Sequence, residues 1–274
     1  MKLSILPVSL FADISSGKIT IAEWASHVQA LGVDGYDISI MFIPNHTATL
    51  IGRLKDESKA AGVNIQPFMV CCYPDFTNPD SLERDRQVDY LKRDIALVSD
   101  LGFKAMRITA GQNHAGLTID EGSSLCVDCF SRVADTAQKY GVKLMFENHS
   151  KPGAWPLIDF SFNPDAFLAV VEKMKDLPIG INFDTANAVA CGANATELLE
   201  KVIDKVWTVH LNDTSTVGKW TPVTIGKGLV DYDAVFNVLN KNKFDGWVCI
   251  EEASGNGWQG IDDAVAFARQ YVKK

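Results

Sequence analysis

The sequence predicts an α/β protein whose strand–helix units close into a single (β/α)₈ TIM barrel, with its active site at the C-terminal face of the strands. Strand-like apolar segments alternate with amphipathic segments along the whole chain, and there are eight such pairs. The strand-like segments are apolar throughout rather than at alternate positions, which is typical of a parallel sheet buried on both faces. Such barrels commonly contain about 250 residues, so we expect one domain over residues 1–274.

Each predicted strand leads into a predicted helix. The strands cover residues 2–10, 34–40, 64–73, 104–111, 143–149, 179–185, 206–213 and 246–252. The helices cover residues 20–33, 50–63, 82–103, 126–142, 163–177, 194–205, 231–244 and 260–274. Several helices end in LGV, AGV, LGF or YGV, where glycine suits the left-handed position that terminates a helix. Asp or Asn precedes several of them, as expected of an N-cap.

A doubly wound open sheet is the alternative architecture. Such sheets usually carry a glycine-rich phosphate loop after the first strand, and LPVSLFADISSG contains no GxGxxG. The N-terminal MKLSILPVSLF fits a first strand better than a signal peptide. No apolar stretch approaches the roughly 20 residues that cross a bilayer, so we expect no contact with a membrane. The absence of GxGxxG likewise argues against an open sheet.

The composition restricts the class of partner. A net charge of −8 argues against a nucleic-acid surface, which needs a basic stripe. Of the six cysteines, Cys126 and Cys129 form a CxxC in a predicted helix, where both thiols share one face. Without a second CxxC this pair is more typical of buried small residues than of a zinc or redox site. Cys71 and Cys249 lie in apolar strands, and the whole pattern predicts a reducing cytoplasm.

Four predicted strands, the fifth to the eighth, each end in one potential metal ligand. These residues are Glu147, Asp184, His210 and Glu251. The C-terminal ends of all strands in a parallel barrel lie on one face, so the four side chains should meet at the same rim. A single carboxylate there is often only solvated, but four ligand-type residues in equivalent places predict a shared site. Mixed oxygen and nitrogen ligands suit Mn²⁺, Mg²⁺, Co²⁺ or Fe²⁺, and zinc also fits.

The motifs ENH, FDTAN, HLND and IEE at these strand ends resemble the xylose isomerase-like TIM barrels, and the resemblance covers essentially the whole chain. That superfamily includes sugar isomerases and epimerases, inosose dehydratases and type IV apurinic endonucleases. The resemblance implies one Mn²⁺ or similar ion on all four residues, with Glu147 and Glu251 also acting as the acid/base pair. Many epimerases have His where Asn187 stands, which puts their usual ketohexose contact in doubt.

The leading hypothesis is a metal-dependent sugar, sugar phosphate or keto-polyol isomerase or epimerase that transfers a proton α to a carbonyl through an enediolate. The alternative is a dehydratase of the inosose or dehydroshikimate type on the same barrel. A non-catalytic sugar-binding barrel is a third hypothesis. The endonucleases hold three zinc ions and need further histidines, and only five histidines occur in this chain.

Five residues are candidate substrate contacts: Arg107, His149, Asn187, Trp155 and Lys219. Arg107, near the end of the fourth strand, would bind a substrate oxygen or a catalytic carboxylate, or else form a buried ion pair below the rim. His149 shares the side of Glu147 if that strand continues. Trp155 would pack on a sugar ring or anchor its loop, and Lys219 lies in a loop that often supplies a basic contact in the family. We expect a small sugar or polyol partner, no nucleic acid, no membrane, and, from the family, a homo-oligomer.

Overall fold

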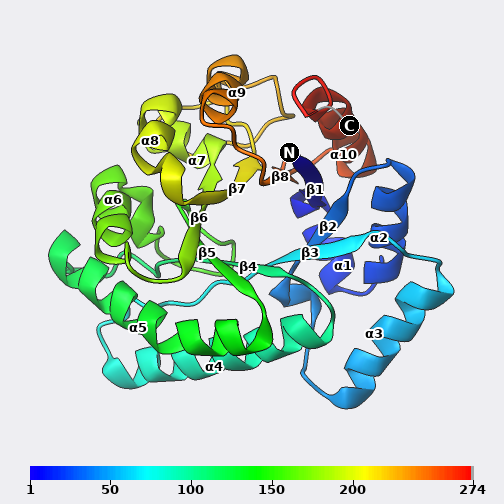
Figure 1. The fold of residues 1–274 in the computed structure, drawn as a ribbon, viewed down its shortest axis with the longest axis horizontal. Helices are drawn as coiled ribbons and strands as arrows, with labels where there is room; N and C mark the ends of the chain where they lie inside the picture. Colours follow the sequence, from blue (N-terminus) through cyan, green and yellow to red (C-terminus); the bar gives the residue numbers. More distant parts are fainter. Residues whose placement is uncertain (273–274) are drawn as a thin grey trace.

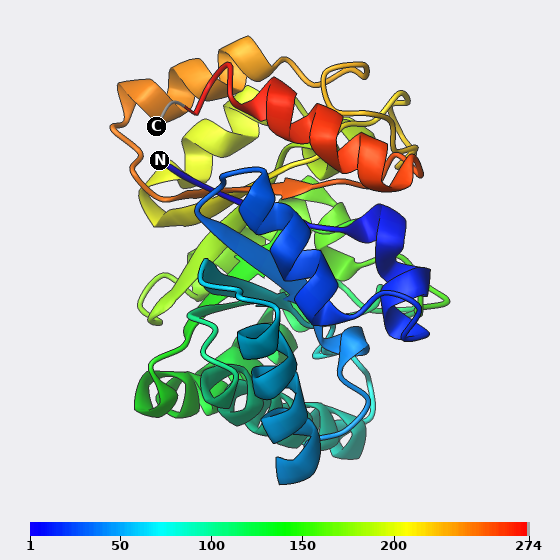
Figure 2. The same cartoon turned by 90° about the vertical axis from the view of Figure 1, so that its right-hand side faces the viewer.

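In the computed structural model, which describes residues 1–272, eight parallel strands form a nearly closed barrel with helices on the outside (Figures 1 and 2). The sheet order is β1-β8-β7-β6-β5-β4-β3-β2, so each strand lies beside its neighbour in sequence. The predicted (β/α)₈ fold is confirmed. The strands are β1 (Lys2–Leu6), β2 (Gly35–Ser39), β3 (Gln66–Cys71), β4 (Ala105–Ile108), β5 (Lys143–Glu147), β6 (Ile179–Asp184), β7 (Val206–Leu211) and β8 (Trp247–Glu251).

Side chains help to close the barrel where β1 meets β2, the two ends of the sheet order. The Asp34 amide donates to the Leu3 carbonyl at 2.9 Å, and the Leu3 amide donates to Asp34 Oδ2 at 2.8 Å. The Ser4 hydroxyl donates to Asp37 Oδ2 at 2.6 Å, while Asp37 Oδ1 accepts from the Met69 amide at 3.0 Å. Asp37 is completely buried, and this burial raises its pKa to about 7.

Helices cover the outer surface of the sheet and correspond to the eight predicted ones. They are α2 (Ile21–Ala30), α3 (Ala48–Ala60), α4 (Ser81–Asp100), α5 (Ile119–Tyr140), α6 (Pro164–Lys173), α8 (Ala195–Val202), α9 (Tyr232–Lys241) and α10 (Gly257–Ala268). Gly141, of the predicted YGV, adopts φ 66° and terminates α5 in the left-handed conformation. The glycines thus mark helix ends as the sequence predicts.

Three differences from the predicted elements each have a local explanation. β1 ends at Leu6 rather than residue 10, because Pro7 lacks the N–H that a ladder needs. Two short helices follow it, η1 (Val8–Leu10) and α1 (Phe11–Ser15). Helix α5 begins seven residues earlier than predicted, because Thr118 and Glu121 form a capping box. An additional helix, α7 (Thr185–Ala190), directly follows β6, where no helix was predicted.

The predicted last helix ends at Ala268, and residues 273–274 lie outside the described part of the chain. The remaining short helices are η2 (Ile40–Phe42), η3 (Phe160–Phe162) and η4 (Ile203–Lys205). Within residues 1–272 no helix is both long enough and apolar enough to span a bilayer.

All six cysteines are unpaired thiols within the described chain. Cys126 and Cys129 are buried in α5, and Cys71 and Cys249 are buried in the barrel, as the sequence predicts. Cys191, at the C-terminal end of α7, is the one cysteine of the described residues that is not fully buried. These thiols therefore pack as small apolar residues.

Candidate metal and active site

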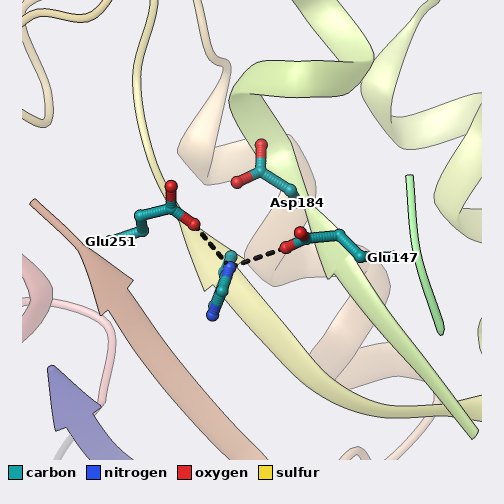
Figure 3. Close-up of side chains that lie close together, drawn as sticks. Glu147, Asp184 and Glu251 are labelled. Atoms are coloured by element: carbon teal, nitrogen blue, oxygen red, sulfur yellow. Dashed lines mark ion pairs between the residues drawn. The ribbon is translucent and has the colours of Figure 1, made fainter. Parts of the chain in front are cut away.

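The four strand-end residues come together at one rim of the barrel. Glu147, Asp184 and Glu251 are the last residues of β5, β6 and β8, and His210 is the last but one of β7. One potential ligand atom from each of the four lies within 4.8 Å of all the others, and all four side chains are buried. Figure 3 shows the three carboxylates directed toward a common region. The predicted convergence is therefore present in the fold.

His210 lies between the two glutamates. Its Nδ1 is 2.7 Å from Glu147 Oε1 and 2.7 Å from Glu251 Oε2, the two contacts drawn as dashed lines in Figure 3. Neither ring nitrogen of His210 has a well-aligned hydrogen-bond partner among the described residues, and Asp184 Oδ2 and Glu251 Oε2 are also without one. Buried ligand atoms that approach one another without hydrogen bonding are what a metal site provides. The donor set fits one divalent cation.

The pKa values of the clustered side chains also indicate a site for a cation. Burial opposes the ionisation of Glu147, but the positive charges of Arg107 and His210 outweigh it and lower its pKa to about 2. Burial and the charges of Glu251 and Glu147 raise the pKa of Asp184 well above its usual value. For His210, burial is outweighed by the same two glutamates, which raise its pKa well above the ordinary range. Three buried carboxylates therefore attract positive charge to this point.

Glu147 is held more firmly than its partners. Arg107 Nε lies 3.0 Å from Glu147 Oε2, and both side chains are at most 1% exposed. The amide of Asn182 donates to Glu147 Oε1 at 2.6 Å, and Asn182 in turn accepts from Thr208 Oγ1 at 2.6 Å. The guanidinium of Arg107 also lies over the ring of Tyr73, 4.7 Å from its centroid. Arg107 thus forms a buried ion pair with Glu147, whose catalytic role stays a prediction.

Asp184 also begins helix α7. Its Oδ1 accepts from the Asn187 amide at 2.6 Å, so that it acts as the N-cap and leaves Oδ2 free to face the cluster. The side chain of Asn148 donates to the Asp184 carbonyl and accepts from its amide, both at 2.8 Å. The Asn148 and Asn187 contacts fix the backbone and the orientation of this ligand.

A cavity of about 500 Å³ borders the cluster at Glu251. Among the predicted substrate contacts, Arg107, His149 and Asn187 line it, together with Glu251. Burial lowers the pKa of His149 to about 4, so this ring is neutral at physiological pH. Trp155 and Lys219 are not among the lining residues, and Lys219 is exposed. The site therefore brings together three of the five.

Sequence reasoning missed several residues of this site. Trp220 lines the cavity, although its neighbour Lys219 was the predicted contact. Tyr73 lines it from the start of the segment after β3, and Phe11 lines it from the first position of α1. Asn182 could have been found, because it stands two residues before Asp184 and strand alternation places both on one face. The loop residues carry no comparable signal in the sequence.

The sequence of this chain matches a known protein family and a curated enzyme. The model of a family described as xylose isomerase-like TIM barrel matches residues 22–271. An inosose dehydratase of Clostridium beijerinckii is 20% identical over 171 residues, which are 57% of this chain and 55% of that protein. The chain thus aligns with little more than half the length of this curated relative.

Two solved structures share the fold over nearly the whole chain. A D-tagatose 3-epimerase-like protein is 17% identical with a TM-score of 0.76, and the match covers 99% of this chain and 97% of that one. The IOLI protein with a bound zinc atom is 20% identical with a TM-score of 0.76, and the match covers both chains completely. At these identities the likeness establishes the fold.

Proposed function

The chain belongs to the xylose isomerase-like TIM barrel family, and we propose that it is a divalent-metal-dependent enzyme that isomerises or epimerises a sugar, sugar phosphate or keto-polyol. The observation that carries the proposal is the buried group of Glu147, Asp184, His210 and Glu251, which borders a ligand-sized cavity through Glu251. The four would hold one ion, for which we propose Mn²⁺, and residues 1–274 would act as one domain in the cytoplasm. When bound, the ion would polarise a substrate carbonyl and stabilise the charge of an enediolate.

Side chains of the protein would transfer the proton, position the catalytic carboxylates and line the cavity. Glu147 and Glu251 each lie 2.7 Å from Nδ1 of His210, and in the proposed reaction one carboxylate removes the proton α to the carbonyl while the other returns it. Arg107 and Asn182 keep Glu147 ionised and fix its orientation. Leu6, Phe11 and Trp220 give the cavity apolar walls that exclude water and pack against the C–H faces of a sugar.

Dehydration is the second candidate, favoured by the match to an inosose dehydratase. The same proton removal serves both reactions. If the proton returns to the opposite face of the same carbon, the result is an epimer; if it returns to the neighbouring carbon, it is an isomer. If a β-hydroxyl leaves instead, taking a proton to form water, the product is an unsaturated ketone.

The test begins with elemental analysis of the purified protein. Ketoses, sugar phosphates and inososes are then incubated with it in D₂O, and proton NMR follows exchange of the hydrogen on the carbon α to the carbonyl. We expect exchange with at least one substrate, and its loss in Glu147→Gln and in Glu251→Gln. Ultraviolet absorption of an unsaturated ketone separates dehydration from isomerisation.

A matched control is Glu252→Gln. Glu252 follows Glu251 directly and is also buried, but it lies outside the ligand group and accepts from the Ser254 amide at 2.8 Å. We expect this variant to retain exchange. Full exchange by both Glu147→Gln and Glu251→Gln would refute the acid/base assignment, and binding of sugars without exchange would favour a non-catalytic barrel.

A further inference from the structure

Asp159 is a completely buried carboxylate that the proposed reaction does not use. It lies in the long segment after β5 and is the N-cap of η3. Its Oδ1 accepts from both the amide and the hydroxyl of Ser161, each at 2.7 Å. Its Oδ2 is buried without a hydrogen-bond partner among residues 1–272. One oxygen is enough for the cap, so the second oxygen needs another explanation.

The unpaired oxygen faces His149. The distance from Asp159 Oδ2 to His149 Nδ1 is 3.7 Å, and Nδ1 is itself a buried atom without a hydrogen-bond partner in the described chain. A movement of less than about 1 Å would bring the pair to the usual hydrogen-bond distance of about 3 Å. A buried polar atom without a hydrogen-bond partner destabilises the folded state, so closure of this contact is favourable.

The other nitrogen of His149 faces the reaction centre. His149 Nε2 lies 3.9 Å from Glu147 Oε2, and His149 lines the cavity beside Arg107 and Glu251. A hydrogen bond at Nδ1 fixes the plane of the ring, and therefore the direction in which Nε2 points.

Ser161 connects this pair to the backbone that carries the site. Its hydroxyl oxygen accepts from the His149 amide at 3.1 Å. The hydroxyl hydrogen is within reach of both Asp159 Oδ1, at 2.7 Å, and the Glu147 carbonyl, at 3.1 Å. The backbone of Asp159 adds a further link, because its amide donates to the Ser150 carbonyl at 2.7 Å. Asp159 is thus anchored to the same short segment that it would orient.

We propose that Asp159 is a positioning residue, which holds Nδ1 of His149 so that Nε2 points at a hydroxyl or carbonyl oxygen of the substrate beside Glu147. This inference rests on the proposed function for the identity of the ligand, but not for the contact between the two side chains. Asp159 touches neither substrate nor metal and acts through His149 alone.

Two substitutions at one position separate this role from simple capping. Asp159→Ser keeps an oxygen that can cap η3 but is too short to reach His149. Asp159→Asn keeps the cap and places an amide N–H opposite Nδ1; the carboxyl of Asp159, whose pKa burial raises well above its ordinary value, likewise offers a proton there. If Asp159 only caps, both variants behave like the wild type; if it orients His149, only Asp159→Asn does.

The first measurement requires no turnover. Long-range ¹H–¹⁵N spectra of the Mg²⁺-loaded protein report the tautomer of each of its five histidines, and His149→Gln assigns the signal of His149. We expect one dominant His149 tautomer in the wild type and in Asp159→Asn, and a mixture in Asp159→Ser. Unchanged His149 signals in Asp159→Ser would overturn the proposal, whether or not a substrate has been found.

The second measurement uses the exchange reaction. We expect kcat/KM to fall roughly 10- to 100-fold in Asp159→Ser, with the metal content unchanged, and to stay within about 3-fold of wild type in Asp159→Asn. Because Asp159 acts through His149, adding Asp159→Ser to His149→Gln should cause little further loss. Fully additive losses would contradict the assignment. If Asp159→Ser folds poorly, Ser161→Ala, which keeps Asp159 but removes its support, should partly mix the same tautomers; an unaltered signal there overturns the proposal as well.

Discussion

Replacing Asp37 by Asn should stabilise the protein, and more strongly at alkaline pH than at acidic pH. Asp37 lies at the β1–β2 closure of the barrel, where Oδ2 accepts from Ser4 Oγ and Oδ1 from the Met69 amide. An asparagine of the same shape can accept from Met69 and donate to the Ser4 oxygen. The substitution therefore keeps the packing and both hydrogen bonds, and removes only the buried ionisable group.

The magnitude follows from the pKa of Asp37. Burial raises this pKa from 3.8 to about 7, although the Ser4 hydroxyl and the charge of His210 favour the ionised form. A carboxyl with a raised folded-state pKa binds its proton more tightly when folded, so stability is lost as pH rises from about 4 to about 7. One pH unit corresponds to about 1.4 kcal/mol. The raised pKa thus destabilises the folded state by about 4 kcal/mol at pH 8, where folded Asp37 is ionised, and by roughly 1.5–2 kcal/mol at pH 5, where it stays protonated but the unfolded chain ionises.

Thermal unfolding followed by circular dichroism at pH 5 and pH 8 measures this difference. Metal affinity changes with pH in every variant, so wild type and variant are compared at each pH separately. We expect Asp37→Asn to raise Tm by several degrees at pH 8, at roughly 2 °C per kcal/mol for a chain of this size, and by less than half as much at pH 5. Asp34→Asn, at the same closure but on an exposed residue, is the control. An equal gain at both pH values, or a loss at pH 8, would refute the reasoning.

Further predictions concern the site and the packing. Asp184→Asn should weaken Mn²⁺ binding by more than about 10-fold in calorimetry, and addition of Mn²⁺ at 100 times its Kd should stabilise the wild type by about 3 kcal/mol in thermal unfolding. Arg107→Met leaves the buried Glu147 carboxylate without its guanidinium, so unfolding experiments should show a loss of about 3–5 kcal/mol. Gly180→Ala puts a methyl group into the indole ring of Trp207 and should lower the free energy of unfolding by about 1–3 kcal/mol. Gly52→Ala, in the open interior of α3, should instead raise stability by about 0.5–1 kcal/mol.

The barrel and its four rim residues could be predicted because each strand end is marked by a local change in the sequence, from apolar residues to a polar one. A buried parallel strand is apolar until it reaches the rim, so a charged residue at its end is conspicuous. Glu147 and Asp184 are the last residues of their strands, as this logic requires. Barrel topology then supplies the long-range information, since all strand ends meet on one face.

Loop residues could not be predicted in the same way. Asp159 follows Glu147 by twelve positions through a segment without a helix or strand, and nothing periodic in that segment indicates that the Asp159 carboxylate returns to His149. Trp220 rather than Lys219 enters the cavity, and adjacent loop positions offer no rule for which one turns inward. Loop conformation depends on tertiary contacts that a pattern of residue types does not encode.

The burial of five of the six cysteines gives this protein a built-in labelling site. Cys191 ends the short helix whose first turn is capped by Asp184, so a dye on its sulfur would sit one helix length from a candidate metal ligand. Burial raises the pKa of the Cys191 thiol, which makes coupling to a maleimide slow at neutral pH and faster under mildly alkaline conditions. Metal titrations can then be followed by fluorescence without introducing or removing a single thiol.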